Sequence, residues 1–418
     1  MPDAPAASRP TLPRQTIVIL GGGFAGLRAL YRLRDLTEQA DLVLVDLRAT
    51  SLSRPALPEV ALAGKSVEHA RFPLAGAVAR AGVRFERRAV ERVEAADRRL
   101  VFDDGSTLAY DYLLLALGAK KDYDAIPGFR DFGYTLCDDT EAPRLAEALD
   151  RFTGGPVVIG SAKSTWGTRV QVPRLAAPCE GPVAEIMFMV DHELRRRGLR
   201  DRSPIRVFSP GEIFFEDVGP AVHSAVGSLV EAAGIEVTTG KVLSRLSEGA
   251  VEFEDGTRWD SALSIVLPPY AGNPVVKRSP GLGDDQGFIP TDQAMRHLDL
   301  DRVYAAGDGT ALSMPKLGHI AVIQADVAAA ALRHDLTGTG DIPPYRPEVF
   351  CIANRGGAQA TLIYSDNLFG GSIDLTLDGP PAHLMKWAFD GYYFHTQGHL
   401  PPDLASEGLE MLLRGTHR

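Results

Sequence analysis

The chain has 418 residues, of which 45% are hydrophobic and 23% are charged, and its formal net charge is −10. This length suffices for two or three domains of roughly 150 residues each, with a large core. The acidic balance argues against a nucleic-acid partner, whose phosphates would repel the protein. No apolar run reaches about 18 residues, so we expect no helix that crosses a membrane.

The N-terminal stretch, residues 1–15, is rich in Pro and Ala and holds no apolar segment of the signal-peptide type. We interpret it as a disordered lead and expect a cytoplasmic protein. The three cysteines, Cys137, Cys179 and Cys351, are far apart in the chain. A cytosolic protein would not normally hold them in structural disulfides. Buried thiols that act as small apolar side chains are therefore the simplest interpretation at this point.

The first predicted strand, residues 17–20, is a short apolar run that leads directly into Gly21-x-Gly23-x-x-Gly26. Without a β-carbon, Gly21 can make a tight turn, Gly23 admits a pyrophosphate to the backbone, and Gly26 lets the next helix pack closely. The free N–H groups and positive dipole end of that helix would face the phosphates. The stretch therefore predicts a dinucleotide site.

Two further strands support this site. Residues 42–45 form an apolar strand that ends in Asp46, whose carboxylate can accept both ribose hydroxyls of an adenosine. Residues 90–93 and 99–102 predict antiparallel strands that lead into the buried stretch 110–118. That stretch ends in Ala-Leu-Gly, which is typical of two-domain flavoprotein reductases when it lies beside a dinucleotide site.

A last strand, residues 302–308, ends in a Gly-Asp pair of the kind that contacts the ribityl or pyrophosphate part of a flavin. The stretch 315–328 begins with Pro and Gly and then becomes helical, so its N-terminus can stabilise negative charge on a reduced flavin ring. Four signals in this order predict an FAD-binding domain, residues 16–130 and 271–345, split around a second domain, residues 131–270. The predicted cofactor-binding residues are Gly21, Gly23, Phe24, Ala25, Gly26, Asp46, Ala116, Gly118, Gly307, Asp308, Lys316 and Gly318.

The second domain lacks a glycine-rich loop of its own. Its first strand, residues 156–160, is followed by Ser-Ala-Lys-Ser-Thr-Trp-Gly, where an NADH-binding domain would carry Gly-x-Gly-x-x-Gly. Without those glycines the backbone cannot close around a second pyrophosphate. We therefore expect a second Rossmann-like fold without an obvious nicotinamide site, which argues against an NADH dehydrogenase.

Cys179 precedes a predicted helix in which Pro182 suits the first turn. A position just before a helix N-terminus favours the thiolate, so we expect a thiol pKa below the usual value of about 8.5. Glu185, one turn into the helix, either exchanges protons with this cysteine or serves only as a charge that suits the helix dipole.

These features together resemble the sulfide:quinone oxidoreductase family over nearly the whole chain. The resemblance rests on the split FAD domain, the degenerate second loop, Cys179-x-Gly-Pro with Glu185 six residues after the cysteine, the late Cys351, and the segment 386–393. All three cysteines fall where the family places its three, which replaces the interpretation as structural thiols. The fold implied is α/β, with two Rossmann-like domains and a C-terminal amphipathic segment.

The resemblance implies that Cys179 and Cys351 meet on one face of the flavin. They would form a redox-active pair that oxidises sulfide to polysulfide or persulfide sulfur through a disulfide. Cys137 would assist sulfur release or link covalently to the flavin, and the sequence leaves both roles open. Some members carry a histidine four residues after this cysteine, whereas Glu141 stands there in this chain.

The acceptor implied by the resemblance is a quinone held between aromatic rings, for which Phe350 and Phe389 are the candidates, with Lys386 or Lys316 nearby. Each phenylalanine has an equally good alternative role in the core. The predicted C-terminal segment, residues 346–418, contains two apolar and aromatic stretches, 384–394 and 404–413, that suit a bilayer interface. These stretches would make the protein peripheral on the cell membrane, or they would pack onto the core or form a dimer contact in a homo-oligomer.

Three other functions remain open at this stage. A type II NADH:quinone oxidoreductase shares the architecture, and a flavoprotein sulfide dehydrogenase would pass electrons to a cytochrome. A sulfide or persulfide sensor would use FAD and thiols without turnover. We predict no metal site, because His383, His395 and His399 lack the close spacing of metal ligands.

Overall fold

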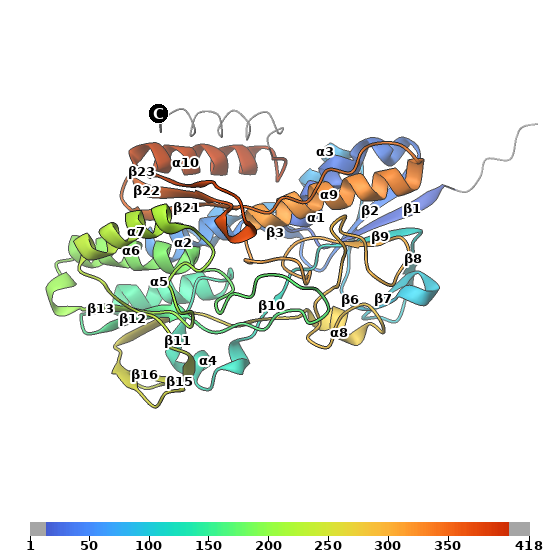
Figure 1. Cartoon of the computed structure of the whole chain (residues 1–418). Coiled ribbons are helices and arrows are strands. Elements are labelled where there is room, and N and C mark those ends of the chain that lie inside the picture. Colours follow the sequence, from blue (N-terminus) through green and yellow to red (C-terminus); the bar gives the residue numbers. More distant parts are fainter. Residues whose placement is uncertain (1–13, 401–418) are drawn as a thin grey trace, which may run out of the picture.

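A computed structural model describes residues 14–400 of the chain, which contain two parallel β-sheets and several smaller antiparallel ones (Figure 1). The first parallel sheet has the strand order β20-β9-β1-β2-β5. Alternate side chains of a strand point to opposite faces, so Ile17 packs into one hydrophobic core and Val18 into another. Both faces of this sheet are therefore covered, as the apolar runs predict. Its strands are β1 (Gln15–Leu20), β2 (Ala40–Asp46), β5 (Arg84–Arg87), β9 (Tyr112–Leu115) and β20 (Val303–Ala305).

Two long helices that are far apart in the sequence pack against each other beside this sheet. They are α1 (Phe24–Leu33) and α9 (Gly318–Thr337), and α3 (Leu74–Ala81) lies next to α1. A three-stranded antiparallel sheet covers the other face, with a short helix packed on it. These elements are β6 (Val90–Glu94), β7 (Arg99–Phe102), β8 (Thr107–Ala109) and α8 (Pro274–Arg278).

The second parallel sheet has the order β11-β18-β12-β13-β14, so two Rossmann-like units are present as predicted. Its strands are β11 (Gly133–Tyr134), β12 (Val157–Ser161), β13 (Ile205–Phe208), β14 (Glu236–Thr238) and β18 (Leu263–Leu267). Its main core is shared with four helices, α2 (Leu57–Leu62), α5 (Glu141–Arg151), α6 (Gly181–Arg196) and α7 (Pro220–Ala233). The remaining elements of this part are α4 (Phe129–Phe132) and the antiparallel strands β15 (Leu243–Ser247), β16 (Ala250–Phe253) and β17 (Arg258–Asp260).

The chain passes between the two sheets on a pair of short antiparallel strands, β10 (Lys120–Lys121) and β19 (Tyr270–Ala271). β10 follows the first sheet and β19 follows the last strand of the second sheet. A second short pair, β3 (Thr50–Leu52) and β4 (Arg71–Pro73), flanks α2 in the sequence. The β10–β19 pairing fixes the two crossings next to each other, where they border the cavity described below.

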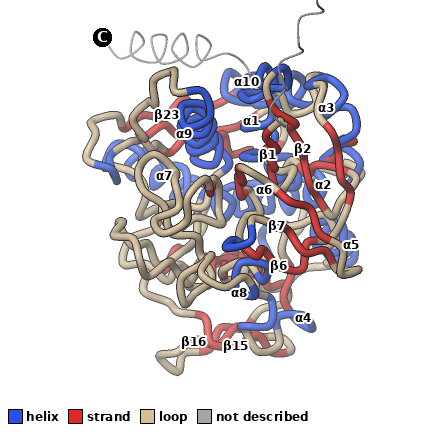
Figure 2. The backbone as a smooth tube through the Cα atoms, turned by 90° about the vertical axis from the view of Figure 1, so that its right-hand side faces the viewer, coloured by secondary structure: helices blue, strands red, loops and turns tan. Residues whose placement is uncertain are grey.

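The C-terminal region differs from our prediction, because it begins with a sheet that we did not expect. Three antiparallel strands, β21 (Val349–Gly356), β22 (Gln359–Ser365) and β23 (Asp374–Gly379), precede α10 (Pro380–His395). β21 packs against α6 of the second Rossmann-like unit. In Figures 1 and 2, α10 lies at the same edge of the molecule in both views. The second apolar stretch that we predicted, residues 404–413, lies outside the described residues.

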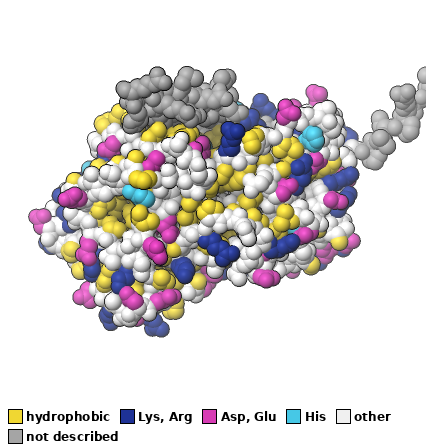
Figure 3. All heavy atoms as spheres, in the orientation of Figure 1, with side chains coloured by type: hydrophobic (Ala, Val, Ile, Leu, Met, Phe, Trp, Pro, Cys, Tyr) yellow, Lys and Arg dark blue, Asp and Glu magenta, His cyan; other side chains and the backbone are white. Residues whose placement is uncertain are grey.

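Charges of both signs are interspersed over the face shown in Figure 3, and hydrophobic side chains gather across its middle. The most exposed of the large hydrophobic side chains on α10 are Leu384 and Trp387, which are 61% and 70% exposed. Within residues 14–400, no helix combines the length and the apolar character that a membrane crossing requires.

Candidate active site

A single cavity of about 1400 Å³ connects the two Rossmann-like units with the C-terminal sheet. It is larger than the roughly 300–1,000 Å³ of a pocket for one small ligand, so it has room for a dinucleotide and a second molecule. All the site residues predicted from the sequence line it, with the exception of Gly26.

In the glycine loop, Gly21 and Gly26 allow close packing, whereas Gly23 is open to the cavity. A β-carbon at Gly26 would collide with the carbonyl oxygen of Gly21, so this glycine is required where α1 packs onto the strand end. A β-carbon at Gly21, whose φ is +112°, would collide with the carbonyl oxygen of Ala116. A β-carbon at Gly23 would meet nothing within 4 Å. The backbone at Gly23 is thus open to the cavity, at the N-terminus of α1.

Asp46 holds the loop and faces the cavity. Its Oδ2 accepts a hydrogen bond from the N–H of Gly22 (2.6 Å), and its Oδ1 accepts one from the N–H of Arg48 (2.7 Å). Each carboxylate oxygen retains a second lone pair for a ribose hydroxyl. Burial raises the pKa of this carboxyl above its ordinary value.

The far end of the cofactor region is formed where β20 meets α9. Lys316 is buried, and its Nζ donates to the carbonyl oxygens of Asp308 (2.8 Å) and Thr310 (3.1 Å). Burial lowers the pKa of Lys316 to about 7. Gly318 is the first residue of α9, whose N-terminal end faces the cavity. An open glycine backbone, a strand-end acid and a second helix N-terminus fit the phosphates, ribose and flavin ring of FAD.

The sulfur atoms of Cys179 and Cys351 both lie close to Gly181. The place where a β-carbon of this glycine would stand is 3.3 Å from the Sγ of Cys351 and 3.7 Å from the Sγ of Cys179. Cys351 is on β21 and Cys179 directly precedes α6, and both line the cavity as free thiols. The packing of β21 on α6 therefore brings together two cysteines that are 172 positions apart in the sequence.

The expected low pKa of Cys179 was wrong. Helix α6 does begin at Gly181, and the N–H of Gly181 acts to lower the pKa of this thiol. Burial raises the pKa well above its ordinary value, with the Asp217 carboxylate and the neighbouring Cys351 adding to the effect. Burial and the Glu185 carboxylate likewise raise the pKa of Cys351 to about 12. The reduced pair consequently rests as neutral thiols.

Two buried acids beside Cys179 were missed by the sequence analysis. Cys179, Glu180 and Asp217 line one small void. Burial raises the pKa of Glu180 to about 8 and that of Asp217 to about 6. The Oε2 of Glu180 accepts a hydrogen bond from the N–H of Phe215 (2.7 Å). Glu180 was open to prediction, because it follows Cys179 in the chain, whereas no sequence pattern links Asp217 to the site.

Glu185 has a partner that neither of our two interpretations included. Its Oε1 lies 2.6 Å from the Nζ of Lys386 on α10, and both side chains are buried. The same oxygen accepts a hydrogen bond from the N–H of Asn354 on β21 (3.1 Å). Burial acts to lower the pKa of Lys386, but the Glu185 carboxylate outweighs it, so the pKa lies above its ordinary value. This buried ion pair joins α6, β21 and α10 next to Cys351.

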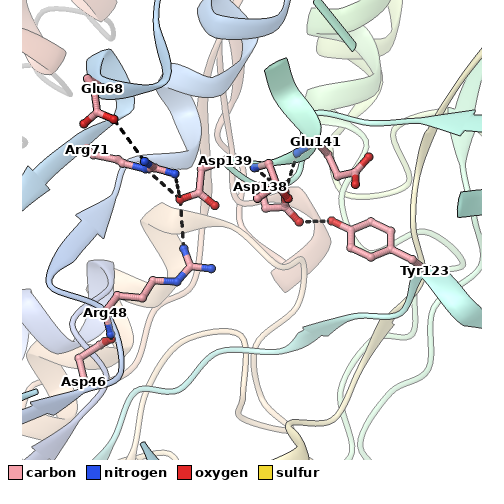
Figure 4. A network of polar contacts seen from close by, with 9 residues as sticks. Asp46, Arg48, Glu68, Arg71, Tyr123, Asp138, Asp139 and Glu141 are labelled. Carbon is pink, nitrogen blue, oxygen red and sulfur yellow. Dashed lines mark hydrogen bonds and ion pairs between the residues drawn. The ribbon is translucent and has the colours of Figure 1, made fainter. Parts of the chain in front are cut away.

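The segment around Cys137 is held by polar contacts on both sides (Figure 4). Asp139 accepts hydrogen bonds from Arg48 (3.4 Å), which lies between β2 and β3, and from Arg71 (2.6 Å), the first residue of β4. Asp138 accepts the hydroxyl of Tyr123 and the N–H groups that begin α5. Cys137 is thereby fixed at the cavity wall, where burial raises its pKa.

Glu141, which stands where some relatives of the resembled family carry a histidine, begins α5. Its Oε2 accepts a hydrogen bond from Nη1 of Arg144 at 2.9 Å. This partner gives the carboxylate a role in the helix. Glu141 does not line the cavity, unlike Cys137.

Lys121 and Tyr270, on β10 and β19, are further cavity residues that the sequence analysis missed. The Nζ of Lys121 lies 3.9 Å from the ring centre of Tyr270 and 4.0 Å from the Oδ2 of Asp308. Burial lowers the pKa of Lys121 to about 8. Burial raises the pKa of Tyr270 well above its ordinary value, and thiolate charge on Cys137 or Cys179 would add to that. The sequence signal that could have identified Lys121 was its position three residues after Gly118.

The predicted quinone residues line the same cavity as the cysteines. Phe389 stacks on Tyr393 with ring centres 5.9 Å apart, and Tyr393 stacks on Phe24 at the start of α1. Phe350 lies between His319 and Tyr364, with ring-centre distances of 5.3 and 5.8 Å. Both phenylalanines are only partly buried. Each therefore has a core contact and a ring face near the cavity.

The second Rossmann-like unit carries a long loop in place of a phosphate turn. Residues 162–180 separate β12 from α6, and the Nε1 of Trp166 donates to the carbonyl oxygen of Leu175 (2.7 Å) across that loop. The N-terminus of α6 is occupied by Cys179 and Gly181 instead of an open glycine cradle. The arrangement supports our prediction that this unit lacks the usual nicotinamide site.

Known proteins of two kinds, sulfide-quinone reductases and NADH dehydrogenase-like proteins, are similar to this chain. A family model described as pyridine nucleotide-disulphide oxidoreductase matches residues 15–325. The chain is 24% identical to the sulfide-quinone reductase of Aquifex aeolicus over 95% of both proteins. It is 26% identical to an NADH dehydrogenase-like protein of Mycobacterium tuberculosis, over 71% of this chain and 73% of that protein.

A solved structure gives the same picture of the fold. The sulfide:quinone oxidoreductase from Aquifex aeolicus superposes with a TM-score of 0.86 at 22% identity, covering 96% of this chain and 95% of that one. The family match spans most of this chain, including the glycine loop, both Rossmann-like sheets and the start of α9. The chain therefore belongs to the pyridine nucleotide-disulphide oxidoreductase family, and it is a flavin-dependent oxidoreductase with FAD as its cofactor.

Proposed function

We propose that this protein oxidises sulfide at the Cys179–Cys351 pair and passes the electrons through FAD to a quinone. The observation that carries the proposal is that both sulfurs lie close to Gly181 and that both cysteines line the cavity that the glycine loop also lines. The similarity to sulfide:quinone oxidoreductases over almost the full length supports it.

The sulfur chemistry begins with the pair oxidised to a disulfide. Hydrosulfide attacks one sulfur of this bond, a new S–S bond forms as the old one breaks, and one cysteine becomes a persulfide while the other leaves as a thiolate. When bound, FAD would supply an acceptor for the two electrons that are released as the persulfide and the thiolate join. It would then pass these electrons on to the quinone. Repetition lengthens the sulfur chain until it is released.

Protonation helps the cysteine that leaves. The pKa of Cys179 is raised by burial, and a thiolate of high basicity is a poor leaving group unless it receives a proton. Glu180, with a pKa raised by burial to about 8, is a neutral acid at pH 7 and shares a void with Cys179. We infer that Glu180 supplies this proton to Cys179 across the void that both residues line.

The quinone site that we propose lies between Phe350, Phe389 and Lys386, which line the cavity near Cys351. Reduction of a quinone takes up two protons as well as two electrons. The Nζ of Lys386 is an ammonium group beside Glu185 in a dry environment, so it can donate a hydrogen bond to a developing quinol oxygen and stabilise the negative charge there. Exposed Leu384 and Trp387 on α10 suit contact with a membrane surface, which sedimentation with lipid vesicles can measure.

A type II NADH:quinone oxidoreductase is the second candidate, because an NADH dehydrogenase-like protein is among the relatives. The long loop 162–180 and the two cysteines beside Gly181 count against it. Flavin reduction by NADH in the absence of sulfide is the observation that would favour it.

The variant Cys351→Ser tests the proposal. Without one sulfur of the pair no disulfide forms, so sulfide should reduce the flavin at least roughly 100-fold more slowly, while flavin content is retained. Stopped-flow absorbance under anaerobic conditions measures the rate. Chemical reduction by dithionite, unchanged in the variant, serves as the control. A wild-type rate with sulfide would remove Cys351 from the mechanism.

A further inference from the structure

Gly181 is the first residue of α6 and precedes Pro182. Its φ is not in the left-handed region that favours glycine, in contrast to Gly198, which follows the same helix with a φ of +65°. Glycine also weakens a helix relative to alanine, because it gives up more backbone freedom on folding. A positive φ thus does not explain this glycine, and its surroundings bear on its role.

The surroundings of Gly181 consist of the two sulfurs. Among residues 14–400, and apart from its chain neighbours and its own helix, the only atoms within 4 Å of a β-carbon built there are the Sγ of Cys351 (3.3 Å) and the Sγ of Cys179 (3.7 Å). Other glycines of the chain differ. A β-carbon at Gly26 meets backbone, and one at Gly227 in α7 meets nothing within 4 Å. Gly181 is open towards the reacting atoms.

We propose that Gly181 determines how many sulfur atoms can bridge Cys179 and Cys351, because its missing side chain leaves the space that an inserted sulfur atom occupies. This inference rests on the proposed function, whose sulfur chain it makes specific. Growth of the bridge by one atom consumes one hydrosulfide. One S–S bond breaks and two form, one proton is released, and two electrons pass to the flavin.

The space left by the missing side chain of Gly181 is small compared with the dimensions of a sulfur bridge. An S–S bond is about 2.05 Å long, so a three-sulfur bridge must bow out from the line between the two cysteines. A methyl group at residue 181 would stand 3.3 Å from one sulfur before any atom is inserted, which is already a tight contact. An added sulfur and a β-carbon would compete for one place, and crowding in a packed interior is unfavourable.

The variant Gly181→Ala tests the inference by the number of sulfurs, independently of turnover. Wild-type and variant holoproteins are treated anaerobically with sulfide and a short-chain quinone, quenched in acid and digested. Mass spectrometry then weighs the linked peptides that contain Cys179 and Cys351, and cyanide releases the bridging sulfur for assay. We expect bridges of three or more sulfurs in the wild type and a two-sulfur bridge in the variant, with cyanide-labile sulfur lowered roughly fivefold or more.

Gly227→Ala is the matched control, because it makes the same substitution at an exposed helical glycine that has no sulfur nearby. It should give the wild-type number of sulfurs. An equal sulfur count in Gly181→Ala and the wild type would overturn the inference. If Gly181→Ala fails to bind FAD, the wild type alone decides, since a bridge that never exceeds two sulfurs also contradicts the inference. Failure of the proposed function looks different, because sulfide would then not reduce the wild-type flavin at all.

Discussion

At the scale of single residues, Glu180 links the chemistry of the site to its stability. Burial raises the pKa of this carboxyl from 4.5 to about 8, so the folded protein binds a proton that the unfolded chain releases. The stabilisation is complete below the unfolded pKa and is lost as the pH rises towards 8. Asp217 behaves in the same way, but its folded pKa is about 6. The pH dependence of stability between pH 6 and 8 therefore comes mainly from Glu180.

We predict that Glu180→Gln flattens the pH dependence of stability between pH 6 and 8. In the wild type, the unfolded chain releases the Glu180 proton while the folded protein keeps it, so the free energy of unfolding falls by about 1.4 kcal/mol per pH unit over most of this interval. An amide binds no such proton in either state. Urea unfolding of the holoprotein at pH 6, 7 and 8 measures the slope.

Glu212→Gln, at an exposed position, is the control and should retain the wild-type slope. If Glu180→Gln loses stability with pH as steeply as the wild type, Glu180 is already ionised in the folded protein. It could then not protonate Cys179 at pH 7.

Some of the residues around the cysteines could be predicted from the sequence, and others could not. The three cysteines and the glycines of the first loop could be predicted, because their residue types and spacing are themselves the signal. The pKa of Cys179 was predicted with the wrong sign, since the helix N-terminus is visible in the sequence but burial and Asp217 are not. Lys386 as the partner of Glu185, 201 positions away, was equally out of reach.

At the scale of elements, α10 places two functions on one helix. Its buried side carries Lys386 to Glu185, and Phe389 lies at the cavity, while Leu384 and Trp387 are exposed. A quinone that reached the ring clamp would thus enter beside the exposed hydrophobic side chains.

Phe389→Ala should separate the two half-reactions. Loss of one ring of the clamp weakens quinone binding and orientation, so we expect reoxidation of the flavin by quinone to slow about tenfold, with reduction by sulfide unchanged. Double-mixing stopped-flow absorbance measures both rates. Phe132→Ala, an exposed phenylalanine on α4, should alter neither rate. Reoxidation at the wild-type rate in Phe389→Ala would remove this ring from the clamp.

The C-terminal sheet was the main element that we did not predict. Residues 359–365, Gln-Ala-Thr-Leu-Ile-Tyr-Ser, are rich in β-branched and apolar residues and follow a Gly-Gly turn, which together are a hairpin signal. We gave more weight to the aromatic residues of α10. The sheet matters because β21 brings Cys351 to α6, and the strand pairing that fixes Cys351 opposite Ile363 cannot be read from local composition.

At the scale of the whole molecule, the first parallel sheet was predictable because β1, β2 and β9 contain apolar runs, whereas in the second sheet only β12 was predicted as a strand. The contacts that join the two units and the C-terminal sheet into one cavity were not, since they pair residues far apart in the chain. The two Rossmann-like units therefore share a fold, but only the first has a phosphate-binding glycine loop. In the second, Cys179 precedes the N-terminus of α6, where we propose that it reacts with sulfide.

The central claim is that electrons enter from sulfide and leave to quinone. The most direct test is an anaerobic absorbance titration of the wild-type holoprotein with sulfide, then separately with NADH, followed by a short-chain quinone. We predict that sulfide bleaches the flavin, that NADH alone does not, and that quinone restores the oxidised spectrum. Bleaching by NADH but not by sulfide would contradict the account and identify the protein as an NADH:quinone oxidoreductase.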